Sequence, residues 1–299
     1  MNVTHVFEWE TTRPLIMGVL NVTPDSFSDG GKFRSVEQAV EHAEEMARAG
    51  ADIIDIGGES TRPGASPVSV DEELRRVMPV VERLTATPHL SFGHPLPAQR
   101  GEGKRILISI DTAKAVVAER ALEAGVRVVN DISALRFDPR LVDVVRDAGA
   151  GLVLMHMRGT PQTMQQAPQY QDVVAEVRAF LAERVAYAEA RGLTKSQIAV
   201  DPGIGFGKTV EHNLELLARL EELTALGCPV LVGPSRKSFI GKLLAPPGAD
   251  RARETDGRLW GTVATVVWAV THGARIVRVH DVAETADAVR VVEAIRHAR

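Results

Sequence analysis

The sequence has few of the features that would place it in a membrane or outside the cell. It has one cysteine, Cys228, so no disulfide can form within the chain, which fits a reducing compartment. It has no run of about 18 apolar residues, so no membrane-spanning helix is expected. Residues Met1–Pro14 include Glu8 and Glu10 and lack the apolar core of a secretory signal. We therefore predict a cytoplasmic protein without a membrane partner.

The sequence also lacks a long basic run, and its formal net charge is −4, so a nucleic-acid surface is not predicted. Its 299 residues are 44% hydrophobic and 25% charged, which suits a globular protein with a sizeable core. An α/β barrel of this length is routinely one domain, and we find no linker. We predict a single domain over residues 1–299. Residues 1–14 form an N-terminal extension, with a hairpin or a plug under the barrel as alternatives for Val3–Glu10, and residues 85–104 form a loop insertion rich in proline and glycine.

Apolar runs without polar alternation recur along the chain, as in strands that are buried on both faces. They are Leu15–Leu20, Ile53–Ile56, Ile106–Ile110, Val126–Val129, Leu152–Met155, Ile198–Val200, Val230–Val232 and Ile276–Val279. Amphipathic stretches between them predict helices over Val36–Ala49, Val70–Leu84, Ala113–Ala124, Pro139–Ala148, Asp172–Arg191, Val210–Leu226, Leu259–His272 and Ala283–His297, with a further piece near Lys237–Leu244. Eight strands that are each followed by a helix predict a (β/α)₈ TIM barrel. A doubly wound sheet would want a G-x-G-x-x-G turn after its first strand, which Gly18–Gly31 does not supply.

Polar residues follow each predicted strand, where a barrel carries its active site. They are Asn21, Gly57–Gly64, Asp111, Asn130-Asp131, His156, Asp201–Lys208, Gly233–Lys237, and Arg278 with His280. Asp111, Asn130 and Asp201 offer the donors and acceptors that a purine or pterin edge requires, whereas a sugar is less demanding of this mixture. Basic side chains suit an anionic group such as phosphate, namely Arg62, Lys237, Arg278 and His280. We predict that these residues surround one cavity.

Each of these residues also has a purely structural interpretation. Asp111 could cap the helix that follows it, Asn21 and Asn130-Asp131 could be turn residues, and Lys237 could cap a helix or lie in solvent. For His156 we favour a buried core histidine. The functional hypothesis depends on the joint pattern at successive strand ends, which the structural interpretations do not predict.

The residues around the first two strand ends resemble two long signatures of the dihydropteroate synthases, a family of pterin-binding enzymes. The matching segments are Ile16–Gly31 and Asp52–Gly64, and further motifs follow in the family's order at Ser109–Thr112, Val129–Ile132, Asp201–Phe206, Ser235–Gly241 and Arg278–Asp281. The resemblance implies a TIM barrel and a transferase of folate biosynthesis. Such an enzyme joins (7,8-dihydropterin-6-yl)methyl diphosphate to 4-aminobenzoate and releases 7,8-dihydropteroate and pyrophosphate. A homodimer is also implied.

The resemblance further implies a role for each matching residue. Asn21 helps to bind Mg²⁺, which in turn holds the diphosphate. Arg278 stacks on the pterin ring and forms the anion pocket with His280 and Asn21, and Thr61 contacts the diphosphate. The other pterin-binding residues are Asp111, Asn130, Asp201 and Lys237, with Val279 also expected at the substrate. The residues that shape the 4-aminobenzoate site are Phe27, Arg62, Pro63, Phe206 and Ser238. The catalytic residues are expected to be Asp201, Lys237, Arg278 and His280.

Three other functions are weighed against this one. The first is a catalytically silent homologue that binds pterin or a partner, and an assay for dihydropteroate separates the two. The second is a methyltetrahydrofolate-binding methyltransferase domain, which would need a cobalamin partner. The third is an aldolase that forms a Schiff base on Lys237, which borohydride trapping would reveal.

Overall fold

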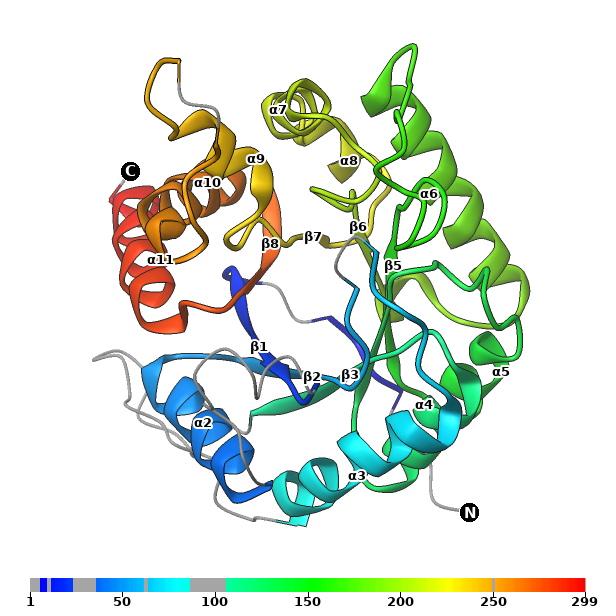
Figure 1. The fold of residues 1–299 in the computed structure, drawn as a ribbon. Coiled ribbons are helices and arrows are strands. Elements are labelled where there is room, and N and C mark those ends of the chain that lie inside the picture. The colour runs from blue at the N-terminus through cyan, green and yellow to red at the C-terminus, as the bar shows by residue number, and fades with distance from the viewer. Residues whose placement is uncertain are drawn as a thin grey trace.

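The computed structural model describes residues 6–9, 12–23, 36–61, 64–86, 106–248 and 251–298. Eight parallel strands form a closed barrel in the order β1 to β8, and helices surround it (Figure 1). The predicted (β/α)₈ TIM barrel is therefore confirmed. The strands are β1 Leu15–Asn21, β2 Ile53–Gly57, β3 Leu107–Asp111, β4 Val128–Asp131, β5 Gly151–Met155, β6 Ile198–Asp201, β7 Val230–Val232 and β8 Ala274–Val279.

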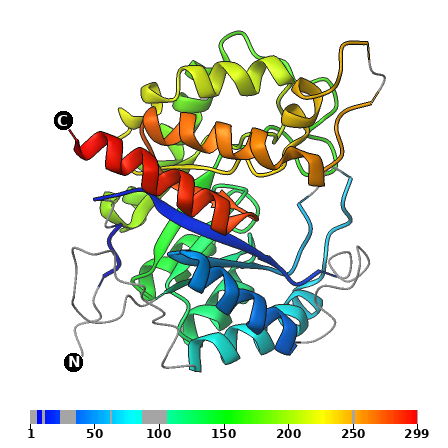
Figure 2. The same ribbon diagram turned by 90° about the vertical axis from the view of Figure 1, so that its left-hand side faces the viewer.

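The helices lie on the outside of the barrel, and Figure 2 shows β1 in blue between the red helix α11 and the blue helix α2. The α-helices are α2 Val36–Ala49, α3 Val70–Ala86, α4 Ala115–Glu123, α5 Leu141–Asp147, α6 Val173–Ala190, α7 Val210–Ala218, α8 Glu221–Thr224, α9 Ser238–Leu243, α10 Leu259–Thr271 and α11 Val282–His297. Two short 3₁₀ helices span Lys195–Gln197 and Asp256–Arg258. In the part of the chain that the structure describes, no helix combines the length and the apolar character that crossing a membrane requires.

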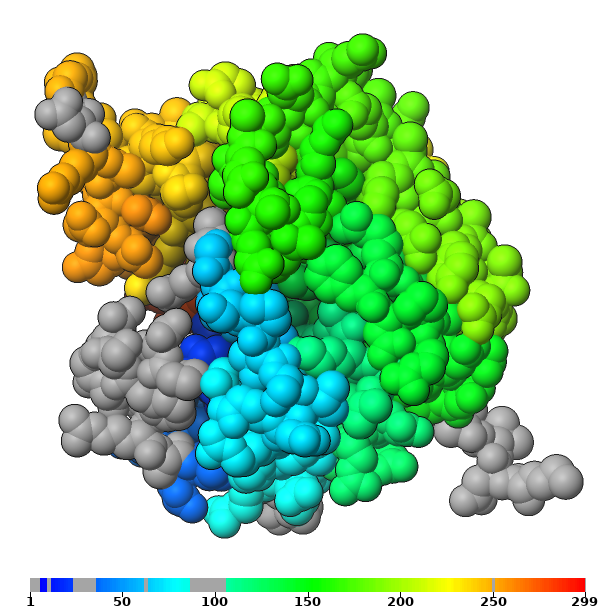
Figure 3. All heavy atoms as spheres, turned by 45° about the vertical axis from the view of Figure 1, so that its right-hand side comes forward, coloured from blue at the N-terminus to red at the C-terminus, as the bar shows by residue number. Residues whose placement is uncertain are grey.

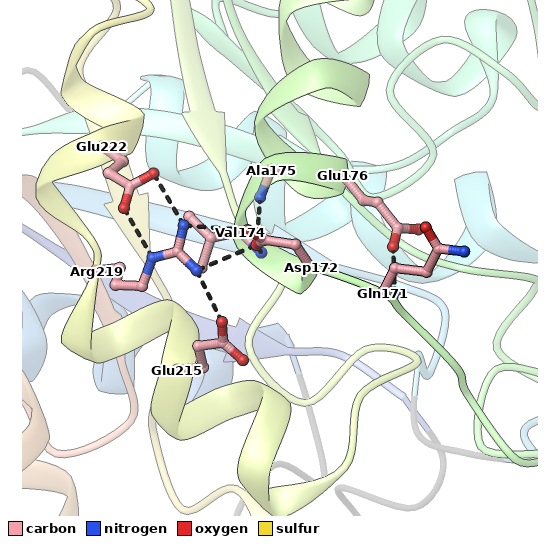
Figure 4. Close-up of polar contacts among 8 residues, drawn as sticks. All are labelled: Gln171, Asp172, Val174, Ala175, Glu176, Glu215, Arg219 and Glu222. Carbon is pink, nitrogen blue, oxygen red and sulfur yellow. Dashed lines mark hydrogen bonds and ion pairs between the residues drawn. The ribbon is translucent and has the colours of Figure 1, made fainter.

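The prediction of one helix over Val210–Leu226 is wrong, because α7 ends at Ala218 and the separate helix α8 begins at Glu221. The backbone of Arg219 leaves the helical region, with φ −111° and ψ 27°. Its guanidinium group binds Glu215 at 2.8 Å, Glu222 at 2.7 Å and Asp172 at 3.2 Å (Figure 4). Because Asp172 also caps α6, Arg219 connects the break between α7 and α8 to the start of a third helix.

The predicted loop insertion begins later than expected. Thr85 and Ala86 belong to α3, where the Thr85 hydroxyl donates to the Val81 carbonyl at 2.8 Å. Residues 87–104 of the prediction lie outside the described residues.

Alternation along the strands separates the side chains of the barrel interior from those that meet the helices. One apolar cluster lies inside the barrel and comprises Phe7, Trp9, Leu15, Met17, Ile53, Val128, Val153, Ala199, Leu231 and Ile276. The intervening strand residues join the helices in a larger cluster, for example Ile54, Val129, Val200 and Val277. The inward series then continues with polar side chains towards the carboxyl ends of the strands: Asn21, Asp55, Asp111, Asn130, Asp201 and Arg278. The interior is therefore apolar at one end and polar at the other.

Residues 6–9 pack into the apolar end of the barrel. The Phe7 amide donates to the Gly149 carbonyl at 2.8 Å, and the Trp9 indole donates to the Gln197 carbonyl at 2.9 Å. A Cβ atom on Gly151 would lie 2.6 Å from the Phe7 ring, so glycine is needed for this close contact. Of the two alternatives for Val3–Glu10, these contacts support the plug for residues 6–9, and the remaining residues of that prediction lie outside the described part.

We predict that Phe7→Ala lowers the free energy of unfolding by about 3–5 kcal/mol, because it removes an aromatic ring from a packed core. Phe7 is 8% exposed, whereas Phe137 is 47% exposed and provides a matched control for the same substitution. Chemical denaturation of both variants measures the difference. Equal losses of stability would show that residues 6–9 do not belong to the core.

Candidate active site

The polar inward residues come together because the strands are in register at their carboxyl ends. Asn21 on β1 pairs with Gly57 on β2, Gly57 with Asp111 on β3, and Asp111 with Asn130 on β4. On the other side of the barrel, Asp201 on β6 pairs with Met155 on β5. Parallel strands bring their carboxyl ends to one face of the closed barrel (Figure 1), so residues that are far apart in the chain lie at the same end of it. We call this group of inward polar residues the cup.

Arg278 on β8 is bound by two carboxylates inside this cup. Its Nε donates to Asp55 Oδ2 at 2.7 Å, and a terminal nitrogen donates to Asp111 Oδ2 at 2.7 Å. Burial opposes the charge of Arg278, but Asp55 and Asp111 outweigh it and raise the pKa of the guanidinium group. Arg278 therefore stays charged and has a defined orientation.

Asp111 belongs to the cup and does not cap the helix that follows it. Helix α4 begins at Ala115, and its N-cap Lys114 makes no side-chain capping bond. Burial raises the pKa of Asp111. The Arg278 charge lowers it, and the nearby Asp55 and Glu73 charges raise it further.

Asn130 and Asp131 have different roles although they are neighbours. The Asn130 amide nitrogen donates to Asp55 Oδ2 at 2.9 Å inside the barrel. Asp131 accepts from the backbone N–H groups of Ser133 at 2.7 Å and Leu135 at 2.5 Å. The turn interpretation thus holds for Asp131, whereas Asn130 lies in the cup.

Asp201 ends β6 and is 6% exposed. It accepts from the Gly203 N–H at 2.6 Å. Burial raises the pKa of Asp201 to about 6, against the Gly203 hydrogen bond and the charge of Lys237. The following turn requires glycine, because Gly203 has φ +67° and a Cβ there would lie 1.9 Å from the His156 carbonyl oxygen.

Lys208 stabilises the turn that contains Gly203. Its ammonium group is buried and donates to the carbonyl oxygens of Gly203 at 3.0 Å and Phe206 at 2.9 Å. It also lies 3.0 Å from His156 Nδ1. Burial and the Lys208 charge lower the pKa of His156 to about 2, so the imidazole is neutral and accepts this bond. His156 is therefore a buried histidine with a satisfied ring nitrogen.

Lys237 and Phe206 meet on the opposite side of the cup from Asp111. The Lys237 ammonium lies 4.0 Å from the centre of the Phe206 ring, a cation–π contact. Removal from bulk water and the Arg278 charge lower the pKa of Lys237 to about 8, although Asp201 opposes them. Lys237 immediately precedes α9 but makes no side-chain capping bond there.

His280 follows β8 and is oriented by Ser235. The Ser235 hydroxyl oxygen lies 2.9 Å from His280 Nδ1 and accepts from the His280 backbone N–H at 3.1 Å. His280 is exposed, yet the surrounding protein and the Arg278 charge lower its pKa. Next to it, Arg236 forms an ion pair with Asp281 at 2.5 Å, which ties the loop after β7 to the end of β8.

Of the other predicted residues that the structure describes, Thr61 is partly exposed, Ser238 is exposed and Val279 is buried. Thr61 lines a cavity of about 470 Å³ that also reaches Asp111. Pro161 lines the same cavity, and its carbonyl accepts from the Gly64 N–H at 3.1 Å. The segment after β2 therefore lies against the segment after β5 (Figure 3, cyan and green). Ser238 is exposed at the start of α9. The Val279 side chain lies between the barrel and the helices and does not face the cup, because it alternates with Arg278.

Phe27, Arg62 and Pro63 lie outside the described residues. The sequence alone indicated no specific role for three residues of the site: Asp55, Lys208 and Ser235. Lys208 and Ser235 lie within the candidate segments that follow β6 and β7, whereas Asp55 lies within an apolar run and not after it. A lone carboxylate between Ile54 and Ile56 is nevertheless a usable signal, because a buried charge requires a partner.

The chain resembles known proteins in both sequence and fold. The model of the family described as pterin binding enzyme matches residues 17–280. The chain is 47% identical to the dihydropteroate synthase of Escherichia coli (strain K12), over 97% of this chain and 94% of that one. The Xanthomonas albilineans dihydropteroate synthase with 4-aminobenzoic acid has 46% identity and a TM-score of 0.82, covering 96% of this chain and 94% of that one. The same protein in complex with 7,8-dihydropteroate has 44% identity and a TM-score of 0.80, covering 96% and 95%. The chain therefore belongs to the dihydropteroate synthases, a family of pterin binding enzymes.

Proposed function

We propose that the protein condenses (7,8-dihydropterin-6-yl)methyl diphosphate with 4-aminobenzoate to give 7,8-dihydropteroate and pyrophosphate. The observation that carries this proposal is the polar cup, in which Arg278 is bound by Asp55 and Asp111, and Asn130 by Asp55. One relative of similar fold, the Xanthomonas albilineans enzyme, is known in complex with 4-aminobenzoic acid and in complex with 7,8-dihydropteroate, which are a substrate and the product of this reaction.

The cup has the hydrogen-bonding groups that a pterin needs. Asp111 and Asp201 accept from ring and amino N–H groups, and Asn130 can both donate and accept. Lys237 supplies a donor to a ring oxygen or nitrogen, and the planar Arg278 side chain can stack on the bicyclic ring. Arg278 and His280, with Thr61 at the rim, attract the diphosphate group. Phe206, beside Lys237, forms one wall for 4-aminobenzoate.

The reaction requires charge stabilisation rather than a protein nucleophile. As the bond from the pterin methylene to the diphosphate breaks, positive charge develops on the methylene and delocalises into the ring. The Asp201 carboxylate offsets this charge, and the amine of 4-aminobenzoate attacks the methylene and then loses a proton. Arg278 and His280 stabilise the charge of the departing pyrophosphate. These residues act by position and electrostatics.

We further propose that Mg²⁺ acts with the diphosphate. The Asn21 carboxamide and the Asp111 carboxylate face one space that a Cβ on Gly57 would enter, 3.8 Å from Asn21 Oδ1 and 3.7 Å from Asp111 Oδ2. Oxygen ligands suit Mg²⁺, and few protein ligands suffice when substrate phosphates supply the others. No metal-binding group of three or more His, Cys, Asp or Glu occurs among the described residues, so the diphosphate would be a main ligand. When bound, Mg²⁺ would neutralise the charge of the leaving group.

The product assay tests the function and the metal together. Purified protein with both substrates and Mg²⁺ should release dihydropteroate and pyrophosphate in equal amounts, and excess EDTA should abolish turnover until Mg²⁺ is restored. An Asn21→Ala variant should require a higher Mg²⁺ concentration. Full turnover in EDTA would contradict the metal assignment. A failure to form either product in Mg²⁺ would contradict the function and favour a catalytically silent homologue.

We predict that Asp201→Asn lowers kcat by about 100- to 1,000-fold, because the neutral amide cannot offset the charge on the pterin methylene. Because the pKa of Asp201 is about 6, its carboxylate is charged above that pH and becomes protonated and neutral below it. Activity of the wild type should therefore fall as the pH drops through about 6, and the variant should lack this dependence. Steady-state kinetics over pH 5–8 measure both effects. Unchanged turnover in a folded variant would contradict the charge role.

We also propose a cytoplasmic homodimer in which α7, α9 and α10 form the interface. These helices carry an apolar groove of about 480 Å³ with Leu217, Phe239 and Ile240 in its wall. Leu214, Leu243 and Trp268 line the same groove and are 40%, 52% and 46% exposed. Contiguous exposed apolar surface of this kind usually marks an interaction site.

A charge in this groove should separate the two subunits. We predict that Leu214→Glu converts the protein to a monomer of about 32.3 kDa in sedimentation velocity. Val291 on α11 is 59% exposed, and Val291→Glu provides the matched control because Val291 is not part of the groove. A monomeric wild type, or equal dissociation by both variants, would refute the assigned interface.

A further inference from the structure

Asp55 lies in the middle of β2 and is completely buried, with 0% of its surface exposed. Its side chain faces the barrel axis, one inward position before Gly57. A carboxylate in such a place is strongly unfavourable unless charged or hydrogen-bonded partners replace its hydration. The partners of Asp55 therefore decide whether it only stabilises the fold or also serves the cup above it.

Both hydrogen bonds of Asp55 converge on one oxygen. Oδ2 accepts from Arg278 Nε at 2.7 Å and from Asn130 Nδ2 at 2.9 Å. Arg278 lies on β8 and Asn130 on β4, and each of these strands is separated from β2 by one strand of the barrel. Oδ1 of Asp55 has no hydrogen-bond partner among the residues that the structure describes. A single atom thus orients two side chains that approach from opposite sides.

The two oriented side chains depend on this atom in different ways. Arg278 is bound at Nε by Asp55 and at a terminal nitrogen by Asp111, which fixes the plane of its guanidinium group. Without the Nε contact the plane could rotate. Asn130 donates its amide nitrogen to Asp55, so its amide oxygen is left facing elsewhere and available as an acceptor.

We propose that Asp55 is a positioning residue that orients Arg278 and Asn130 towards the pterin diphosphate without contacting the substrate itself. The inference rests on the proposed function, in which Arg278 stacks on the pterin and Asn130 binds its edge. It predicts that the loss of Asp55 affects the pterin substrate much more than 4-aminobenzoate, which is bound near Phe206.

Two substitutions of Asp55 test whether its hydrogen-bond acceptor is what orients Arg278 and Asn130. Asp55→Ala removes the acceptor and should lower kcat/KM for the pterin diphosphate by about 10- to 100-fold, with the KM for 4-aminobenzoate changed by less than about threefold. In Asp55→Asn the amide oxygen can stay where the two donors converge, and the amide nitrogen takes the place of Oδ1, which accepts no hydrogen bond from the described residues. This variant should recover most of the lost kcat/KM.

Asp52 provides the matched control, because it is a buried aspartate that immediately precedes the same strand. It is 4% exposed, pairs with Arg13 at 2.5 Å and accepts from the Ile16 N–H at 2.8 Å. Asp52→Ala should lower the melting temperature and leave both KM values within about twofold. Thermal unfolding of all variants shows which are folded, and Asp55→Asn keeps the test decisive if Asp55→Ala does not fold.

Three results would overturn the proposal, in addition to an Asp55→Ala variant without any defect. The first is an equal rise in both KM values in Asp55→Ala, the second is the same pterin defect in Asp52→Ala, and the third is an Asp55→Asn variant as impaired as Asp55→Ala. A wild type that forms no dihydropteroate would instead refute the proposed function. If the wild type and Asp52→Ala are active and Asp55→Ala is unimpaired, only the positioning role of Asp55 is refuted.

Discussion

The closure of eight parallel strands imposes one constraint from which the site follows: every second side chain of each strand points at the same axis. Near one end that axis is filled by aliphatic and aromatic groups, which stabilise the barrel. Near the other end the same positions carry carboxylates, a carboxamide and a guanidinium group. Charged groups in such an enclosed space need partners, and the contacts of Arg278 with Asp55 and Asp111 supply them.

The side chains of the cup therefore orient one another through their own ion pairs and hydrogen bonds. Arg278 is compensated by two carboxylates, Lys237 is close to Asp201, and the nearby His156 remains neutral. Donors and acceptors already have fixed directions, so a bound heterocycle meets groups that do not need to reorient. Such preorganisation is how an enzyme stabilises charge that appears only during the reaction.

The strands and most helices could be predicted from the sequence because apolar periodicity and glycine at helix ends are local signals. The strand-end residues could also be predicted, since one rule of the barrel brings them together. Three features depend on contacts between distant segments, and only Asp55, a carboxylate within an apolar run, gave a local signal. The buried Lys208 contacts His156, which follows β5, and the helix break at Arg219 is bound by Asp172, the N-cap of α6. Asp55 meets partners from β4 and β8. The role expected for Val279 came from the resemblance alone, whereas strand alternation beside Arg278 directs that side chain to the helices.

The packing of residues 6–9 has a consequence for how the chain assembles. Phe7 and Trp9 are synthesised early, but the groups that receive them, Gly149, Gly151, Ser196 and Gln197, are synthesised more than 100 residues later. The second edge of β1 likewise pairs only after β8, the last strand in the chain, has been synthesised. Contacts of such long sequence separation form slowly, because the loop-closure entropy must be lost before any contact is gained. Until then an aromatic pair and an open strand edge stay available to other chains, so this barrel is most vulnerable to aggregation during its own synthesis.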